Sequence, residues 1–174
     1  MKYTKILLAT ILALAGATFA SAQKPVKFTS VYTRLDGRGC KTLRGGQGTD
    51  DATLCKGVGG YNVEVYYSAA TIQIGAIRKI DDQIAPLATL NLDFDYTKSR
   101  LEWRLANGKP FAVIMRVPIY APPKDGEYFG KVIGQQLIVV GLVGYEISQK
   151  IDAKLAGANL KTRELADKAF LTKK

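Results

Sequence analysis

Histidine is absent from this chain of 174 residues, and cysteine and tryptophan are scarce, with two copies and one copy. Without histidine the chain has no Ser-His-Asp or Cys-His nucleophile system and no histidine-bearing zinc site. Two cysteines are too few for a four-cysteine zinc or iron–sulfur site. A histidine-based switch near neutral pH is excluded for the same reason. We therefore expect none of these catalytic sets and no cofactor.

Long apolar runs are also lacking, except at the N-terminus. Lys2 and Lys5 stand at the start of this region, the stretch 6–19 is mostly apolar, and Ala20-Ser21-Ala22 has the small-x-small pattern of a cleavage site. The apolar stretch is shorter than the ~20 residues that a membrane span needs. We predict a signal peptide at 1–22, rather than an uncleaved anchor, followed by a single mature domain at 23–174.

Export would place the chain in an oxidising compartment outside the cytoplasm. Removal of residues 1–22, which contain two lysines and no acids, would lower the formal net charge from +10 to +8. The basic residues are spread along the chain and mixed with acids, whereas nucleic-acid binding favours clustered charge with interleaved aromatics. We therefore expect an envelope protein or an anionic envelope component as the partner, no nucleic acid, and no transmembrane segment in the mature chain.

Cys40 and Cys55 are the two cysteines. In an oxidising compartment an even count favours a disulfide, and closing this separation would stabilise the fold by about 3 kcal/mol. The alternative is a redox dithiol, which usually needs two residues between the cysteines. We predict a structural disulfide that closes a polar, glycine-rich loop.

Alternating apolar and polar residues predict strands through most of the chain. Period-two patterns or β-rich runs occupy 28–33, 61–67, 71–80, 90–96 and 101–105. The apolar run 111–120 is interrupted by Arg116, and 137–145 is apolar on both faces, as in a central covered strand. Only the C-terminus has a helical pattern. We predict an α+β fold: a single antiparallel sheet of about six or seven strands, with the C-terminal helix packed on it and one disulfide.

Asn107-Gly108 is the strongest hairpin signal, because both residues tolerate the positive φ of a tight turn. Regular pairing across this turn would put Trp103 near Ala112 and Arg104 near Phe111.

The C-terminal helix is predicted to begin after Asn159 as its N-cap. Pairs at i, i+4 join Glu164 to Lys168 and Arg163 to Asp167. Its apolar stripe consists of Leu165, Ala166, Ala169 and Phe170.

Carboxylates are the one set of side chains left for catalysis or metal binding. Asp93 and Asp95 share a predicted strand face beside Glu102, so the three acids are candidates for calcium binding or acid–base chemistry. Arg100 and Arg104 lie close in sequence, and a solvent-facing ladder of ion pairs explains the same pattern. We favour the ladder, which leaves Asp93 and Asp95 as weak metal candidates.

Two loops are candidate partner-binding elements. Arg44, Gly45 and Gly46 lie in the loop between the cysteines, where backbone N–H groups could hold an anion, although the segment does not match the phosphate-loop pattern. Lys124 and Asp125 follow two prolines, whose rigidity lowers the entropy lost when a protruding loop binds. Ordinary surface loops remain the alternative for both.

Several motifs resemble a family of small exported proteobacterial proteins that has no assigned activity. They are FTSVYT at 28–33, Cys40, CKGVGGY at 55–61, EWR at 102–104 and KPFA at 109–112. The resemblance implies a Gram-negative periplasmic address and supplies no catalytic residue. Size, compartment and disulfide also resemble those of periplasmic lysozyme inhibitors, whose signature residues are not found here.

Together these observations predict a non-catalytic periplasmic binding or interaction protein. The alternatives are a carboxylate-dependent cell-envelope hydrolase, acting through Asp93, Asp95 or Glu102, and an enzyme inhibitor of the lysozyme-inhibitor type.

Overall fold

A computed structural model describes residues 24–35, 38–43, 51–67, 72–79, 90–92, 99–127 and 130–173. Within these ranges the chain forms ten strands and one C-terminal helix. The predicted α+β class, the antiparallel pairing, the C-terminal helix and the disulfide are confirmed. The predicted signal peptide lies outside the described residues.

The strands form two antiparallel sheets rather than the single sheet that was predicted. Sheet A has the order β1-β7-β8-β9-β10, and sheet B has the order β2-β3-β4-β5-β6. The strands of sheet A are β1 (Phe28–Arg34), β7 (Arg100–Ala106), β8 (Lys109–Tyr120), β9 (Val132–Gly141) and β10 (Ser148–Asp152). The strands of sheet B are β2 (Cys40–Leu43), β3 (Asp51–Lys56), β4 (Tyr61–Tyr67), β5 (Ile72–Lys79) and β6 (Leu90–Leu92).

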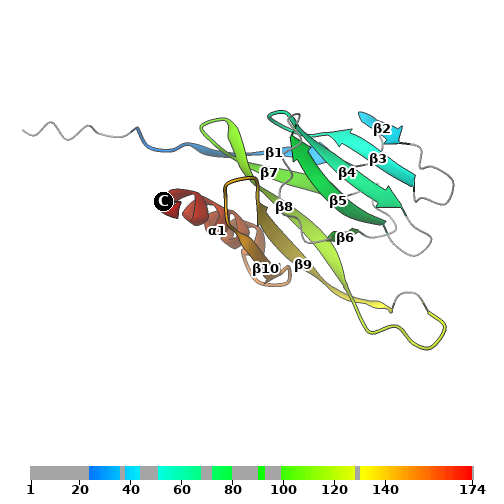
Figure 1. Ribbon diagram of the computed structural model, residues 1–174. Coiled ribbons are helices and arrows are strands. Elements are labelled where there is room, and N and C mark those ends of the chain that lie inside the picture. The colour runs from blue at the N-terminus through cyan, green and yellow to red at the C-terminus, as the bar shows by residue number, and fades with distance from the viewer. Residues whose placement is uncertain are drawn as a thin grey trace, which may run out of the picture.

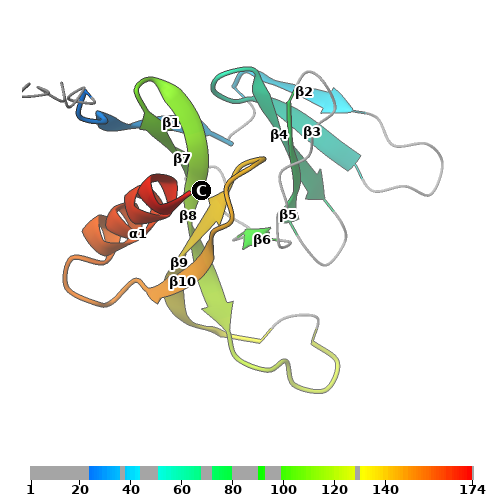
Figure 2. The same cartoon turned by 60° about the vertical axis from the view of Figure 1, so that its left-hand side comes forward.

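Sheet A is the middle layer of the molecule, with sheet B on one face and the helix α1 (Ala158–Thr172) on the other (Figures 1 and 2). Val63 and Ile77 of sheet B pack with Trp103 and Met115 of sheet A in the core between the sheets. A second core, which includes Phe111, Ile114, Val139, Ala158 and Ala166, lies between sheet A and α1. Because both faces of sheet A are covered, its central strands carry nearly continuous apolar runs.

Three of the ten strands, β2, β3 and β10, were not predicted, so the expected number of six or seven strands was too low. Strands β2 and β3 lie within and beside the glycine-rich span between the cysteines, and β10 is a short polar strand with no alternating apolar face. Their backbone pairing depends on partner strands rather than on their own burial, so single-sequence periodicity does not identify them.

The hairpin turn at Asn107-Gly108 is confirmed, with φ of 49° and 81°. The predicted pairing beyond it is wrong by one residue: Trp103 pairs with Val113 and Arg104 with Ala112, because an irregularity next to Arg104 shifts the register. Such an extra residue on one strand is a β-bulge. It places Phe111 and Ala112 together in the core beneath α1.

Cys40 and Cys55 are directly opposed across β2 and β3 and form the predicted disulfide. The nearby Trp103 is fully buried, and its Nε1 donates a 2.8 Å hydrogen bond to Thr33 Oγ1. Gly57 lies so close to this ring that an added Cβ would be 2.5 Å from it. The disulfide therefore links β2 to β3 of sheet B close to Trp103, the largest fully buried side chain.

Helix α1 begins after Gly157, not after Asn159 as predicted, and Gly157 has a φ of 71°. The predicted apolar stripe is partly right: Ala166 is buried and Phe170 packs on the core, but Leu165 is 37% exposed. In the part of the chain that the structure describes, no helix combines the length and apolar character needed to cross a bilayer.

Candidate functional site

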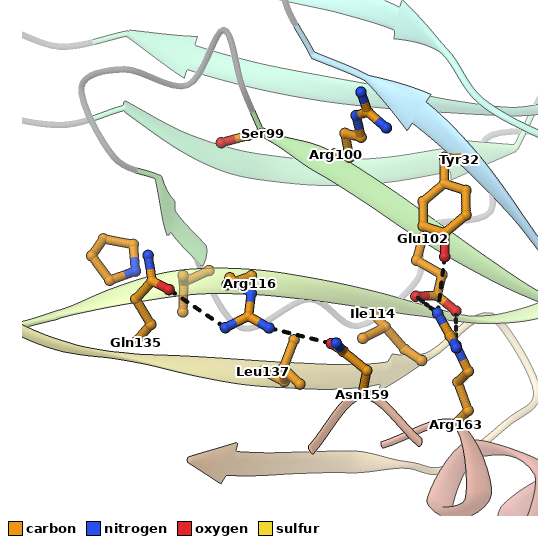
Figure 3. A pocket seen from close by; sticks show the side chains of 12 residues that line it. Tyr32, Ser99, Arg100, Glu102, Ile114, Arg116, Gln135, Leu137, Asn159 and Arg163 are labelled. Atoms are coloured by element: carbon orange, nitrogen blue, oxygen red, sulfur yellow. Dashed lines mark hydrogen bonds and ion pairs between the residues drawn. The ribbon is translucent and has the colours of Figure 1, made fainter. Parts of the chain in front are cut away.

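A groove opens on the helix-side face of sheet A, next to the N-terminal half of α1. Alternate residues of β1, β7, β8 and β9 point to this face, and α1 covers the rest of it. The groove has a volume of about 610 Å³. Its lining consists of Tyr32, Ser99, Arg100, Glu102, Ile114, Arg116, Val117, Pro118, Gln135, Leu137, Asn159 and Arg163 (Figure 3).

One wall of the groove is an ion pair between strand and helix. Arg163 of α1 donates to both carboxylate oxygens of Glu102 on β7, at 2.6 and 3.1 Å. It also donates to the Tyr32 hydroxyl at 2.9 Å, and the Ser30 hydroxyl donates to Glu102 at 2.6 Å. Figure 3 shows Tyr32, Glu102 and Arg163 meeting at this wall. The network fixes the position of the Arg163 guanidinium.

The environment of Glu102 keeps its carboxyl group ionised. Burial alone would raise its pKa, but hydrogen bonds from Arg163 and Ser30, together with the charge of Arg163, hold the pKa below its ordinary value of 4.5. The hydrogen bond to Glu102 also raises the pKa of Arg163. A carboxylate that is ion-paired and hydrogen-bonded in this way is a poor proton donor or acceptor at neutral pH.

A second ion pair lies further along the same face. Arg104 of β7 donates from Nε to Asp167 of α1 at 2.7 Å and from a second nitrogen to the other carboxylate oxygen. It also donates to Ser30 at 3.1 Å and lies over the ring of Phe28. The predicted pair between Arg163 and Asp167 within the helix is therefore not the one observed. Arg163 binds Glu102 and Asp167 binds Arg104, and both of these partners lie on β7.

The centre of the groove has a different character. Arg116 projects from β8 and donates to two neutral acceptors, Gln135 Oε1 at 3.4 Å and Asn159 Oδ1 at 3.3 Å (Figure 3). Among the described residues neither Arg116 nor its neighbour Arg100 forms an ion pair with an acid. The first turn of α1 likewise contains no acidic side chain.

The register brings three arginines into one row across the sheet. Arg34 of β1 is directly opposite Arg100 of β7. Leu101 pairs with Met115, so the backbone positions of Arg100 and Arg116 come next on the adjacent strands β7 and β8, while their guanidinium groups point in different directions (Figure 3). Like charges that are directly opposed on a sheet destabilise it. Among the described residues, Arg100 and Arg116 bring positive charge to this part of the sheet with no acidic partner of their own.

A second hollow, of about 380 Å³, lies on the disulfide side of Tyr32. Arg34, Arg38 and Lys56 are among the residues that line it, beside Cys55. The basic character of the groove thus continues past Tyr32 toward sheet B.

The structure sorts the site residues predicted from sequence into three groups. Glu102 lines the groove, but with Arg163 rather than in a ladder with Arg100 and Arg104. Lys124 and Asp125 are exposed in the turn beyond β8, where the β8–β9 arm extends away from the sheets (Figure 2). The remaining candidates, Arg44, Gly45, Gly46, Asp93 and Asp95, lie outside the described residues.

Sequence reasoning missed the role of Arg116 and Arg163 in the groove. The available signal was Arg116, a single charge inside the apolar run 111–120. A search of the described residues finds no group of three or more histidine, cysteine or acidic side chains that could hold a metal ion. Comparison with family models, with curated proteins and with solved structures finds no match to this chain.

Proposed function

We propose that the chain is an exported, non-catalytic binding protein that holds a component of the bacterial envelope in the groove beside α1. The observation that carries this proposal is the contrast within the groove. Its one acid, Glu102, is bound by Arg163 and Ser30, whereas Arg100 and Arg116 have no acidic partner among the described residues. Such an arrangement favours recognition of a ligand over proton transfer.

Export to the periplasm rests on sequence and is compatible with the fold. The N-terminal basic residues, the apolar stretch 6–19 and the cleavage pattern at 20–22 are typical of a signal peptide. A disulfide between Cys40 and Cys55 is stable in an oxidising compartment. Expression of the complete chain, followed by osmotic shock and intact mass measurement, tests this part. A released protein that begins at Gln23 is the expected result, and a cytoplasmic protein that retains Met1 contradicts it.

The binding role is tested by nuclear magnetic resonance with isotope-labelled protein. Soluble muropeptides, lipopolysaccharide oligosaccharides and phospholipid headgroups are added separately. A ligand of the groove shifts the backbone amide signals of Ser99, Gln135 and Asn159, and it is recovered chemically unchanged. Turnover of an added compound contradicts the non-catalytic role, and shifts confined to other surfaces contradict the site.

A matched pair of variants locates the effect. Asn159→Trp places a large ring over the groove, whereas Leu160→Trp changes the neighbouring residue, which is 59% exposed and does not line the groove. Binding in the groove is lost in the first variant and kept in the second. Equal behaviour of the two variants contradicts the assignment.

A further inference from the structure

We propose that the groove recognises a phosphate monoester group on its ligand, through Arg116 and Arg100, with Arg163 held in place beside them. This inference rests on the proposed binding function and names the chemistry of the ligand. Sheet A brings Arg100 and Arg116, which are distant in sequence, onto the neighbouring strands β7 and β8 at the lining of one groove.

The charges in the groove match a dianion. Three arginines and one glutamate line it, which leaves a net charge of +2, since none of the other lining residues is charged at neutral pH. A phosphate monoester carries close to two negative charges at pH 7, because its second pKa is about 6. One bound phosphate would therefore balance the net positive charge of the groove.

The donor geometry also suits phosphate. A guanidinium group has five N–H donors in a planar fork, which matches two oxygens of a phosphate better than a lysine ammonium does. Arg116 uses two of these donors on Gln135 and Asn159, on either side of its guanidinium (Figure 3). These contacts fix the orientation of the guanidinium group in the groove, so less conformational entropy is lost when a ligand binds. They also leave further N–H donors of Arg116 for the ligand.

Glu102 and Tyr32 act on the third arginine. The Glu102 carboxylate and the Tyr32 hydroxyl both accept hydrogen bonds from the Arg163 guanidinium. The negative charge of Glu102 also offsets the positive charge of Arg163. Arg163 is thus a positioning residue at the edge of the site. The charge available to a ligand comes from Arg100 and Arg116.

Calorimetric titration of the folded chain with phenyl phosphate tests the proposal. Arg116→Gln and Arg100→Gln each remove one charge from the groove, and Lys161→Gln removes one charge from the exposed surface of α1 outside it. The groove variants are expected to weaken binding about tenfold or more, the loss typical of one charge-assisted hydrogen bond. Lys161→Gln is expected to change binding less than about twofold, because exposed charges are screened by salt. Equal losses in all three variants would overturn the proposal.

The pH dependence separates a dianion from a monoanion. The sequence has no histidine, so no histidine of the protein changes its charge between about pH 7.5 and about pH 5.5. Phenyl phosphate loses much of its second charge over this interval, and its binding should fall severalfold. Phenyl sulfate stays a monoanion and should bind more weakly, with no change over the same interval. Identical profiles for the two compounds contradict recognition of a dianion.

The phosphate can belong to a soluble ester or to a lipid headgroup. Vesicles of phosphatidylcholine, alone or mixed with phosphatidic acid or phosphatidylglycerol, distinguish these sources. Binding to phosphatidic acid that needs Arg116 indicates a lipid headgroup, and binding to phenyl phosphate alone indicates a soluble ester. Equal binding to both anionic lipids that survives Arg116→Gln indicates general attraction to a basic protein and overturns the proposal.

Failure of this inference is distinguishable from failure of the binding function. If muropeptides or oligosaccharides without phosphate shift the groove amides while phenyl phosphate and phosphatidic acid do not, the phosphate assignment is wrong and the binding function stands. If none of the probes shifts the groove amides of the folded protein, both proposals are wrong.

Discussion

The helix-side face of sheet A has two ends that use the same side-chain type in opposite ways. At one end Arg104 is bonded to Asp167, and the cluster of Phe28, Phe111 and Phe170 fills the space beside it. At the other end, the acceptors that Arg116 finds among the described residues are neutral. The closed end is packed and electrically balanced, whereas the groove end is open and positively charged.

The partner of an arginine side chain, rather than its residue type, indicates its role here. A partly buried arginine bonded to an acid on another element joins the two elements, and its loss leaves the acid unpaired. Arginines on adjacent strands without an acid weaken the sheet slightly. Retaining such a pair makes sense where a ligand supplies the missing negative charge.

The largest effect is expected from Phe111→Ala at the closed end. Phe111 is 1% exposed and contacts the rings of Phe28, Tyr145 and Phe170, so the change removes ring contacts and leaves a cavity. The free energy of unfolding should fall by about 3–5 kcal/mol. Urea unfolding measures it, with Ile133→Ala as the control, because Ile133 is 58% exposed. A loss no larger than the control's would contradict the assignment of this end as core.

A smaller effect is expected from Arg104→Gln, which breaks the closed end's ion pair. The side chains of Arg104 and Asp167 are 12% and 19% exposed, so the remaining carboxylate is left poorly solvated. The free energy of unfolding should fall by about 2 kcal/mol. A double-mutant cycle with Asp167→Asn measures the coupling between the two residues. Strict additivity would show that the pair does not join α1 to β7.

Glu102 lies between the two ends, and its lowered pKa makes the free energy of unfolding of the protein depend on pH. Its folded-state pKa is lowered, so its contribution is present above pH 4.5 and is lost as the pH falls below that value through the folded pKa. Glu102→Gln should therefore lower stability at pH 7, by about 1–2 kcal/mol because Arg163 is partly exposed. The difference between the variant and the unchanged protein should shrink toward pH 3. Denaturant unfolding at several pH values measures it, and a constant difference would contradict this account.

The smallest effect, and one of opposite sign, is expected from Arg100→Gln at the groove end. Removing one of the like charges on adjacent strands should raise the free energy of unfolding by a few tenths of a kcal/mol at low salt. The gain should vanish as salt screens the remaining charges. Thermal unfolding at low and high salt, with Lys161→Gln as the control, measures it. A loss of stability would show that Arg100 is structural, and the contrast between the two ends would disappear.

Local patterns predicted much of the fold. Period-two patterns identified β4, β5 and β7, and aromatic and β-branched content identified β1. Asn107-Gly108 identified the β7–β8 turn. These features depend on neighbouring residues alone. The bulge that places Phe111 beneath α1 was not predicted, since regular alternation contains no signal for an extra residue in one strand. The same limit applies to the start of α1: Asn159 suits an N-cap, but in the structure it binds Arg116.

By itself the sequence determined which chemistries are absent, that two cysteines are available to pair, and where the central apolar strands run. These properties follow from residue counts and from spacing along the chain. Only the tertiary structure decided that the strands divide into two sheets and that Arg163 binds Glu102 rather than Asp167. It alone aligned Arg34, Arg100 and Arg116, which are far apart in sequence. The physical reason is that register and sheet order set which distant charges meet, and no local pattern encodes them.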